Sequence, residues 1–508
     1  MGNINLGGTF VLFFSNLLGK IFGAIYRLPL SNILGAEGMG LYQMAFPTYS
    51  FLLTFITGGI SIGLTRKIAE LRASEDYFSI YKNYKMGKNI SFYFGLIFFV
   101  FLVLFAYPIS FIQGNTSAFL GYLGIALGFI FACMLGAYRG YYQGFGNMIP
   151  TALSQVVEQS IKLVFGLVFA VIFGKINISW GVFGALLGVS VSEIISFLFF
   201  VILNKKHIKK FDCKIEKSEY KLFFKQTLPI NISYMILPLS TLIDSFLVIN
   251  LLKFSGLNLT LATSLYGIET GMILPLINVP NVLISAIALA SIPQISYKLS
   301  KKQDISEDLS SIFKLVICFL LPCIFGMFIL SKPILSIVFP TLSGEFLNLA
   351  NLLLKFSVYE MFFLCFVTIT NAILLATNNA KKVIKSLSFS VLFKIIIMII
   401  LILIPSINIF GLVLASTVCY MICSFINLSY IKKVNPFNIK ILDGIIPLFA
   451  CLVMALVIYL EMILFPNMTF INVCFIVLSA VITYFTILLA FGLIKLKEIK
   501  KLLHSSVK

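Results

Sequence analysis

Two basic side chains lie in the first apolar segment of a chain whose residues are 60% hydrophobic. Lys20 and Arg27, within NLLGKIFGAIYRLPLS (16–31), are seven residues apart and therefore share one face of a helix. A charge deep in a bilayer costs roughly 2.5–3.5 kcal/mol on insertion scales, so such residues usually face a cavity or a partner. Either side chain could extend along the helix to place its charge at the membrane surface, which is called snorkelling. The two side chains could not both do so in the same direction. A basic face on an aqueous cavity would attract an anionic ligand, and the guanidinium of Arg27 suits phosphate.

A second group of ionisable residues accompanies the stretch YRGYYQGFGNMIPTALSQVVEQ (138–159). Arg139 ends one apolar segment, and Glu158 and Lys162 lie near the start of the next. Glu158 precedes Lys162 by four residues, which is the better orientation for an ion pair on a helix. Such a pair can be structural or can line a cavity. Arg66 is a further candidate at the end of the second apolar segment, after a stripe of small polar residues that equally suits helix packing.

A carboxylate lies deep in another apolar segment, LPINISYMILPLSTLIDSFLVIN (228–250). Asp244 has Thr241, Ser245 and Pro238 nearby in the sequence. Oxygen-rich clusters of this kind suit a coupling cation such as Na⁺, or the carboxylate can take a proton. The alternative is a hydrogen-bonded Asp with a structural role. Four other acidic residues are weaker candidates of the same kind: Glu193, Glu269, Glu360 and Glu461.

The elements that carry these residues are predicted to be membrane-spanning helices. Mean hydropathy is +1.04, and only 11% of residues are charged, against about 25% in a typical soluble domain. Apolar runs of about 20 residues recur along the chain, and the alternating pattern of a β-barrel is absent. We therefore predict an all-α polytopic membrane protein with about fourteen spans. The nine cysteines form no CxxC motif and there is no P-loop, which argues against a metal site and a nucleotide-driven pump.

The net charge of +19 is distributed as in a multi-pass membrane protein, not as in a nucleic-acid-binding protein. Of the 38 Lys and Arg residues, 30 fall in one alternating set of polar breaks, three in the other set and five within spans. This asymmetry predicts that both termini are cytoplasmic and that the protein lies in the cytoplasmic membrane. The N-terminal sequence MGNINLGGTF predicts no cleaved signal peptide.

An internal repeat divides the spans into two sets of six. The offset is 224 to 232 residues, and both sets begin on the same side, so the repeat is parallel. We predict an N-terminal lobe at 1–210, a C-terminal lobe at 211–435, and two appended spans with a basic cytoplasmic tail at 436–508. The matching stretches are 144–163 with 376–395, 176–186 with 407–415, and 40–46 with 264–270.

Three motifs resemble the stage V sporulation protein B group: GKIFGAIYRLPLSNILGAEGMGLYQMAFP (19–47), the stretch at 138–159, and ALASIPQIS (288–296). That group belongs to the polysaccharide-flippase branch of the multidrug/oligosaccharidyl-lipid/polysaccharide exporter superfamily and is related to MurJ-type lipid II flippases. The resemblance covers nearly the whole chain. It implies fourteen helices, which form two six-helix lobes and two appended helices. It also implies export of an undecaprenyl-linked sugar. A peptidoglycan precursor such as lipid II, in a spore former for the cortex, is the leading candidate.

The resemblance also implies roles for individual residues. MurJ-type flippases line their cavity with arginines on helices 1, 2 and 8. Arg27, with Lys20, matches the first position, whereas the second span offers only Arg66 and the eighth offers Glu269. Asp244 lies on the seventh span, where some relatives have a sodium-coupling Asp. The implied partners are an undecaprenyl-diphosphate-linked sugar and membrane lipid, with cell-wall synthesis proteins as further candidates and no nucleic acid.

The sequence therefore predicts an alternating-access flippase that moves a lipid-linked sugar from the inner to the outer leaflet. It is not expected to be an enzyme or to carry a cofactor, and Na⁺ or H⁺ would be the coupling ion. The candidate cavity residues are Lys20, Arg27, Arg66, Arg139, Glu158 and Lys162, with Asp244 for ion coupling. The rival functions are an ion-coupled drug exporter of the same superfamily, an exporter of another lipid-linked polysaccharide unit, a membrane-embedded glycosyl transferase and a non-transporting scaffold.

Overall fold

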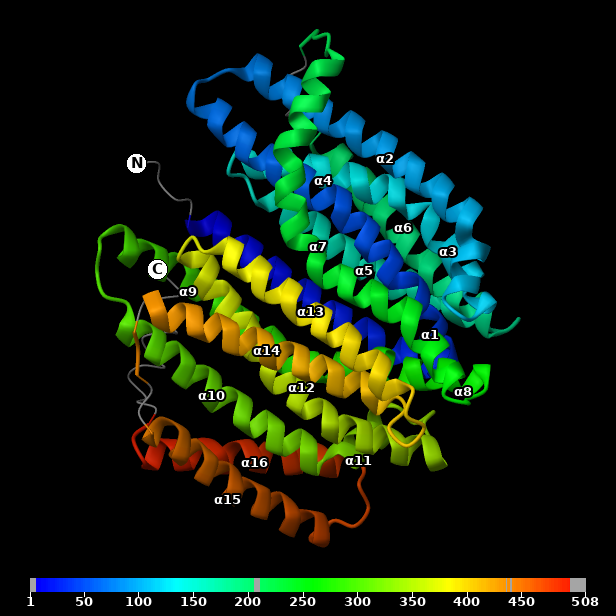
Figure 1. Cartoon of the computed structure of the whole chain (residues 1–508), viewed down its shortest axis with the longest axis vertical. Helices are drawn as coiled ribbons and strands as arrows, with labels where there is room; N and C mark the ends of the chain where they lie inside the picture. Colours follow the sequence, from blue (N-terminus) through cyan, green and yellow to red (C-terminus); the bar gives the residue numbers. More distant parts are fainter. Residues whose placement is uncertain (1–5, 205–210, 435, 439–440, 494–508) are drawn as a thin grey trace. The chain divides into compact units, whose positions relative to one another are not determined.

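The computed structural model describes residues 6–204, 211–434, 436–438 and 441–493, and every regular element in these ranges is a helix (Figure 1). All fourteen predicted spans have their centres within helices. These predicted centres are Gly23, Phe55, Val100, Phe129, Val164, Ser190, Leu239, Ile277, Ile324, Phe362, Lys394, Tyr420, Met454 and Val481. The prediction of an all-α polytopic protein is confirmed.

The number of spans depends on how the longest helix is divided. Among the described residues, twelve helices are long and apolar enough to cross a membrane, and two helices that meet at a 45° bend, Thr116–Ala126 and Gly128–Gly144, form a thirteenth crossing. Helix α1 (Leu6–Ala73) has 68 residues, far more than the ~20 that one crossing needs. Gly35 interrupts it with a φ of 68°, a conformation that glycine adopts without steric cost. Counting the two parts of α1 separately agrees with the predicted fourteen.

The chain folds into two compact units, which are Met1–Pro275 with Ile399–Ile409, and Leu276–Met398 with Phe410–Lys508. The predicted boundaries at 210 and 435 separate the two halves of the internal repeat, not compact units, and they remain predictions.

The helices begin at positions that follow the offset of the repeat: α13 starts 231 residues after α5, and α14 starts 232 residues after α6. The helices after α1 are α2 (Tyr77–Ile112), α3 (Phe119–Ala126), α4 (Gly128–Gly144), α5 (Ile149–Gly174), α6 (Ile178–Asn204), α7 (Lys217–Phe254), α8 (Leu259–Gly267), the π-helix η2 (Ile268–Ile273), α9 (Leu274–Ser300), α10 (Ser306–Ile329), α11 (Ser331–Val338), α12 (Gly344–Ala376), α13 (Ala380–Ile402), α14 (Phe410–Val434), α15 (Leu442–Leu464) and α16 (Phe470–Ala490).

Helix α1 is the central element of the first unit and contacts α2, α4, α5, α7 and α8 (Figure 1). A buried polar network fixes its middle. Tyr122 donates a hydrogen bond to Gln113 Oε1 over 2.7 Å, and the Gln113 amide donates to the Met44 carbonyl and to Ser245 Oγ, each over 3.1 Å. Because buried polar groups that are fully bonded rigidify a core, this network fixes α1 against α3 and α7.

Glycines allow α1 to approach α8 and η2 closely. A Cβ atom on Gly40 would lie 2.1 Å from the Thr263 carbonyl oxygen, and one on Gly267 would lie 2.0 Å from the Ala36 carbonyl oxygen. Ser31 Oγ also donates to the Gly271 carbonyl over 3.4 Å. Small residues at such contacts let helix backbones meet, which is the usual way that membrane helices pack. The α1–η2 contact forms one wall of the site described below.

In the second unit, α12 and α14 form the most extensive helix pair and share a polar centre with α13. The buried Asn427 amide donates to Asn371 Oδ1 over 2.8 Å and to Thr370 Oγ1 over 3.1 Å, and its carbonyl accepts from Ser386 over 2.6 Å. One side chain thus joins three helices by bonds that lipid cannot supply.

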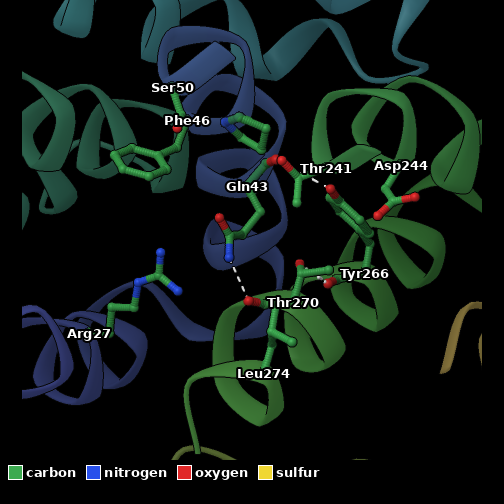
Figure 2. A pocket seen from close by; sticks show the side chains of 10 residues that line it. Arg27, Gln43, Phe46, Ser50, Thr241, Asp244, Tyr266, Thr270 and Leu274 are labelled. Carbon is green, nitrogen blue, oxygen red and sulfur yellow. Dashed lines mark hydrogen bonds between the residues drawn. The ribbon is translucent and has the colours of Figure 1, made fainter. Parts of the chain in front are cut away.

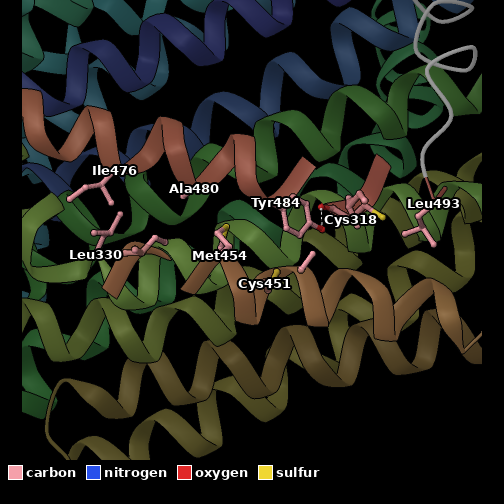
Figure 3. Packing of buried hydrophobic residues seen from close by; sticks show 11 residues of the cluster. Cys318, Leu330, Cys451, Met454, Ile476, Ala480, Tyr484 and Leu493 are labelled. Atoms are coloured by element: carbon pink, nitrogen blue, oxygen red, sulfur yellow. Dashed lines mark hydrogen bonds between the residues drawn. The ribbon is translucent and has the colours of Figure 1, made fainter. Parts of the chain in front are cut away.

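The two appended helices pack on α10 through a separate apolar cluster (Figure 3). Met454 on α15 and Ile476 and Ala480 on α16 are almost fully buried there. Tyr484 adds a hydrogen bond of 2.8 Å from its hydroxyl to the Cys318 carbonyl. Beside this cluster lies an apolar cavity of about 390 Å³, lined by residues of α9, α10, α15 and α16.

Candidate functional site

A polar cavity of about 230 Å³ lies within the first unit (Figure 2). Arg27, on the first part of α1, and Asp244, on α7, lie at different ends of it, with Gln43 between them. The pocket therefore offers a cation, a carboxylate and hydrogen-bonding groups together. Its full lining is Arg27, Gln43, Phe46, Pro47, Ser50, Thr241, Asp244, Tyr266, Thr270 and Leu274.

Gln43 is held in position by the segment across the pocket. Its Nε2 donates to the Thr270 carbonyl over 2.5 Å, and the Tyr266 hydroxyl donates to the Gln43 backbone carbonyl over 3.3 Å (Figure 2). Thr270 belongs to η2, a π-helical turn of the kind often found at functional sites. We did not predict Gln43 as a site residue, although it is an amide side chain within the apolar second part of α1, a signal that could have identified it.

Two cations lie beside one aromatic ring at the edge of the pocket. The Arg27 guanidinium carbon is 6.0 Å from the centre of the Phe46 ring, and Lys162 Nζ is 5.3 Å from the same centre. Lys162 also lies 5.2 Å from the ring centre of Tyr26. Within the described part of the chain, neither cation is within 4.0 Å of a carboxylate oxygen. Aromatic faces stabilise such cations without neutralising them, so the pair stays available to an anion.

Glu158 forms a different ion pair from the one predicted. Its Oε2 accepts from Arg139 Nη2 over 2.9 Å, and within the described residues it is not paired with Lys162. Arg139 also donates to Ser154 Oγ over 2.9 Å. The α4–α5 turn brings Arg139 back against the first turns of α5, a tertiary contact that outweighs the local i,i+4 spacing. Arg139 and Glu158 therefore lie together, and Lys162 points to the aromatic rings.

A second carboxylate lies close to this pair. Glu193 on α6 is 7% exposed and accepts a hydrogen bond of 3.2 Å from the Tyr49 hydroxyl. Its charge and that of Glu158 both act on Lys162. Of the weaker acidic candidates, Glu193 is thus the one that joins the charged cluster.

Of the two remaining predicted cavity residues, Arg66 does not line the pocket. Arg66 has a side chain that is 76% exposed and pairs with Glu70 over 3.2 Å, one helical turn away. The side chain of Lys20 lies outside the described residues. The structure thus unites Arg27 with Lys162, and Arg139 with Glu158, while a binding role for Arg66 or Lys20 remains a prediction.

The surroundings of Asp244 differ in part from the predicted oxygen cluster. Thr241 lines the pocket beside it, but the Ser245 hydroxyl donates to the Leu242 carbonyl over 2.7 Å and accepts from Gln113. Asp244 itself is 7% exposed. Among the described residues, no group of three His, Cys, Asp or Glu side chains could hold a metal ion. Ion coupling by Asp244 stays a prediction.

Three comparisons relate the sequence and the fold of this chain to known proteins. A family model described as polysaccharide biosynthesis protein matches residues 6–299. Stage V sporulation protein B of Bacillus subtilis (strain 168) is 26% identical over 98% of this chain and 97% of its own length. Lipid II flippase MurJ of the same organism is 25% identical over 86% of this chain and 84% of its own. A solved structure of lipid II flippase MurJ in an inward closed conformation has a TM-score of 0.73 at 16% identity, covering 95% of this chain and 98% of that one.

Proposed function

Because the chain belongs to the polysaccharide biosynthesis protein family, within the multidrug/oligosaccharidyl-lipid/polysaccharide exporter superfamily, we propose that it is a flippase for an undecaprenyl-linked sugar, most specifically lipid II. The resemblance to the sporulation protein B and MurJ group is confirmed by relatives that match most of the chain. One of these relatives is a lipid II flippase, which agrees with a protein that moves its substrate without a chemical reaction. The name of the other, stage V sporulation protein B, suggests a role in sporulation.

The observation that carries this proposal is the pair of cations at Phe46. A lipid-linked sugar has a diphosphate that cannot enter hydrocarbon without compensation of its charge. Arg27 and Lys162 supply two basic groups that form no ion pair with a described carboxylate, and Arg27 lines the polar pocket. Gln43, Thr241 and Thr270 supply hydrogen-bonding groups for a sugar beside that diphosphate.

The size of the pocket limits what it can hold. Pockets that bury a drug-sized ligand measure roughly 300–1,000 Å³. A cavity of about 230 Å³ therefore suits a phosphate with one sugar ring. The apolar cavity of about 390 Å³ in the second unit has the chemistry required for part of a polyprenyl chain.

The decisive experiment measures lipid II on the outer face of cells that are depleted of their other flippases. Expression of this protein is expected to restore labelling of lipid II by a reagent that cannot cross the membrane. Well-expressed protein that leaves lipid II inaccessible would exclude lipid II as the substrate. Parallel labelling of other undecaprenyl-linked sugars would then identify an exporter of a different polysaccharide unit.

We further propose that Asp244 couples transport to Na⁺ or H⁺. Replacement of Asp244 by Asn keeps its size and removes its charge, so the rate of export is expected to become independent of the coupling ion. Export is measured in proteoliposomes while the Na⁺ and proton gradients are varied separately. An Asp244→Asn protein that retains the wild-type dependence on both ions would remove this role.

We propose that both termini are cytoplasmic, since 30 of the 38 basic residues then lie on the cytoplasmic side. The ion pair of Arg139 and Glu158 joins α4 and α5 near the turn between them, which this orientation places on the side where the lipid precursor is made. Cysteines introduced at 379 and at 406, in the turns before and after α13, test the orientation. Only the second is expected to react with an impermeant thiol reagent in intact cells.

A further inference from the structure

Glu158 is held in place near Lys162, one of the two cations of the proposed binding site. Its Oε2 accepts from Arg139 and its Oε1 accepts from Gln159 Nε2, both over 2.9 Å. The side chain is 16% exposed, and it lies one helical turn before Lys162 on α5. Both oxygens are thus occupied, and a negative charge is fixed beside Lys162.

This carboxylate lowers the positive charge of the site. Arg27, Lys162 and Arg139 are basic, and Glu158 is an acidic residue that pairs with Arg139 and acts on Lys162. Removal of the Glu158 charge therefore raises the net charge of the cluster by one unit. Because charges interact strongly in a partly buried site, the affinity for a diphosphate depends on this difference.

The repeat shows that the carboxylate is not needed for the helix. The equivalent of Lys162 in the second half is Lys394, at an offset of 232, whereas the equivalent of Glu158 is Ser390. The basic residue therefore occurs in both copies and the acidic residue in one. This difference points to a function specific to the first unit.

We propose that Glu158 is an internal counter-charge that weakens diphosphate binding enough for the headgroup to be released. The inference rests on the proposed function. A transporter gains nothing from binding its substrate equally tightly in every state, because release then limits the rate. Glu158 keeps Arg139 occupied and leaves only Arg27 and Lys162 to bind the diphosphate.

The test is Glu158→Gln, which keeps the size of the side chain and one acceptor oxygen and removes its charge. Binding of undecaprenyl diphosphate to purified protein in nanodiscs is expected to tighten roughly tenfold and to depend more steeply on salt. Export at saturating substrate is expected to fall, so affinity and maximal rate change in opposite directions. A purely structural role would weaken both.

The matched control is the double variant Arg139→Gln/Glu158→Gln, which removes the pair and leaves the net charge of the site unchanged. Its affinity is expected to return toward the wild-type value. If Glu158→Gln unfolds at the wild-type temperature but binds no more tightly, or if the double variant binds as tightly as the single one, the counter-charge role is wrong. Wild-type protein that fails to bind undecaprenyl diphosphate would instead overturn the proposed function itself.

Discussion

Export of the lipid-linked headgroup is expected to fall at least about 100-fold when Arg27 and Lys162 are both replaced by glutamine. Hydrogen bonds to charged groups contribute roughly 1.5–3 kcal/mol each, and about 1.4 kcal/mol corresponds to a tenfold change in affinity. The two cations share the Phe46 ring and form no ion pair among the described residues, so a bound diphosphate is expected to form the direct ion pairs that they lack. Either single variant is expected to lose about tenfold.

The measurement is the rate at which labelled undecaprenyl-linked sugar becomes accessible outside proteoliposomes, together with binding of undecaprenyl diphosphate. The control is Lys175→Gln/Lys253→Gln, which removes two exposed positive charges from the same unit. This control is expected to export at nearly the wild-type rate. Full activity of the Arg27/Lys162 double variant would remove the anion-binding interpretation of the pocket.

The second large effect is expected from Gly267→Ala. The added methyl group would lie 2.0 Å from the Ala36 carbonyl oxygen and 2.5 Å from the Gly40 nitrogen, and both are backbone atoms that cannot rotate away. Overpacking of this kind usually costs about 1–3 kcal/mol. Because Gly267 directly precedes η2, whose contact with α1 forms the pocket wall, the variant is expected to lose headgroup binding as well as stability.

Thermal unfolding of the purified protein in detergent measures the effect on stability. The matched control is Gly23→Ala, on α1 in the same unit, where a Cβ atom would meet nothing within 4 Å. Alanine is favoured over glycine in a helix by roughly 0.5–1 kcal/mol, so this control is expected to be neutral or slightly stabilising. Equal unfolding temperatures for Gly267→Ala and wild type would show that α1 and α8 can separate at no cost.

The sequence predicted the helices well because their signal is local. A span is identified by its own apolar residues, so all fourteen predicted centres fall within helices. The duplication comes from a comparison of the chain with itself, and it remains a prediction. The Gly35 break was the harder feature, because the first two spans continue as one helix and no polar loop separates them.

A site residue could be predicted only where its own type, such as a charge within an apolar segment, indicated a function. Arg27 is a charge in an apolar segment, and its place in the pocket follows from that cost alone. The partner of Glu158 could not be predicted in this way. Spacing along α5 favours Lys162, but the α4–α5 turn brings Arg139 within 2.9 Å, and a sequence does not give that distance. The bond from Gln43 to Thr270 joins residues 227 positions apart and lies beyond any local pattern.

The order in which the helices of the first unit are synthesised has a consequence for their insertion into the membrane. The unit extends to Pro275, so α1 enters the membrane well before the α7 and η2 segments that cover it. Ribosomes add roughly 5–20 residues per second. About 10–40 seconds therefore pass between the synthesis of Arg27 and the synthesis of Asp244 and Tyr266. During that interval the charge of Arg27 on the nascent α1 is not yet covered by α7 or η2. We therefore expect an insertase to assist the insertion of α1.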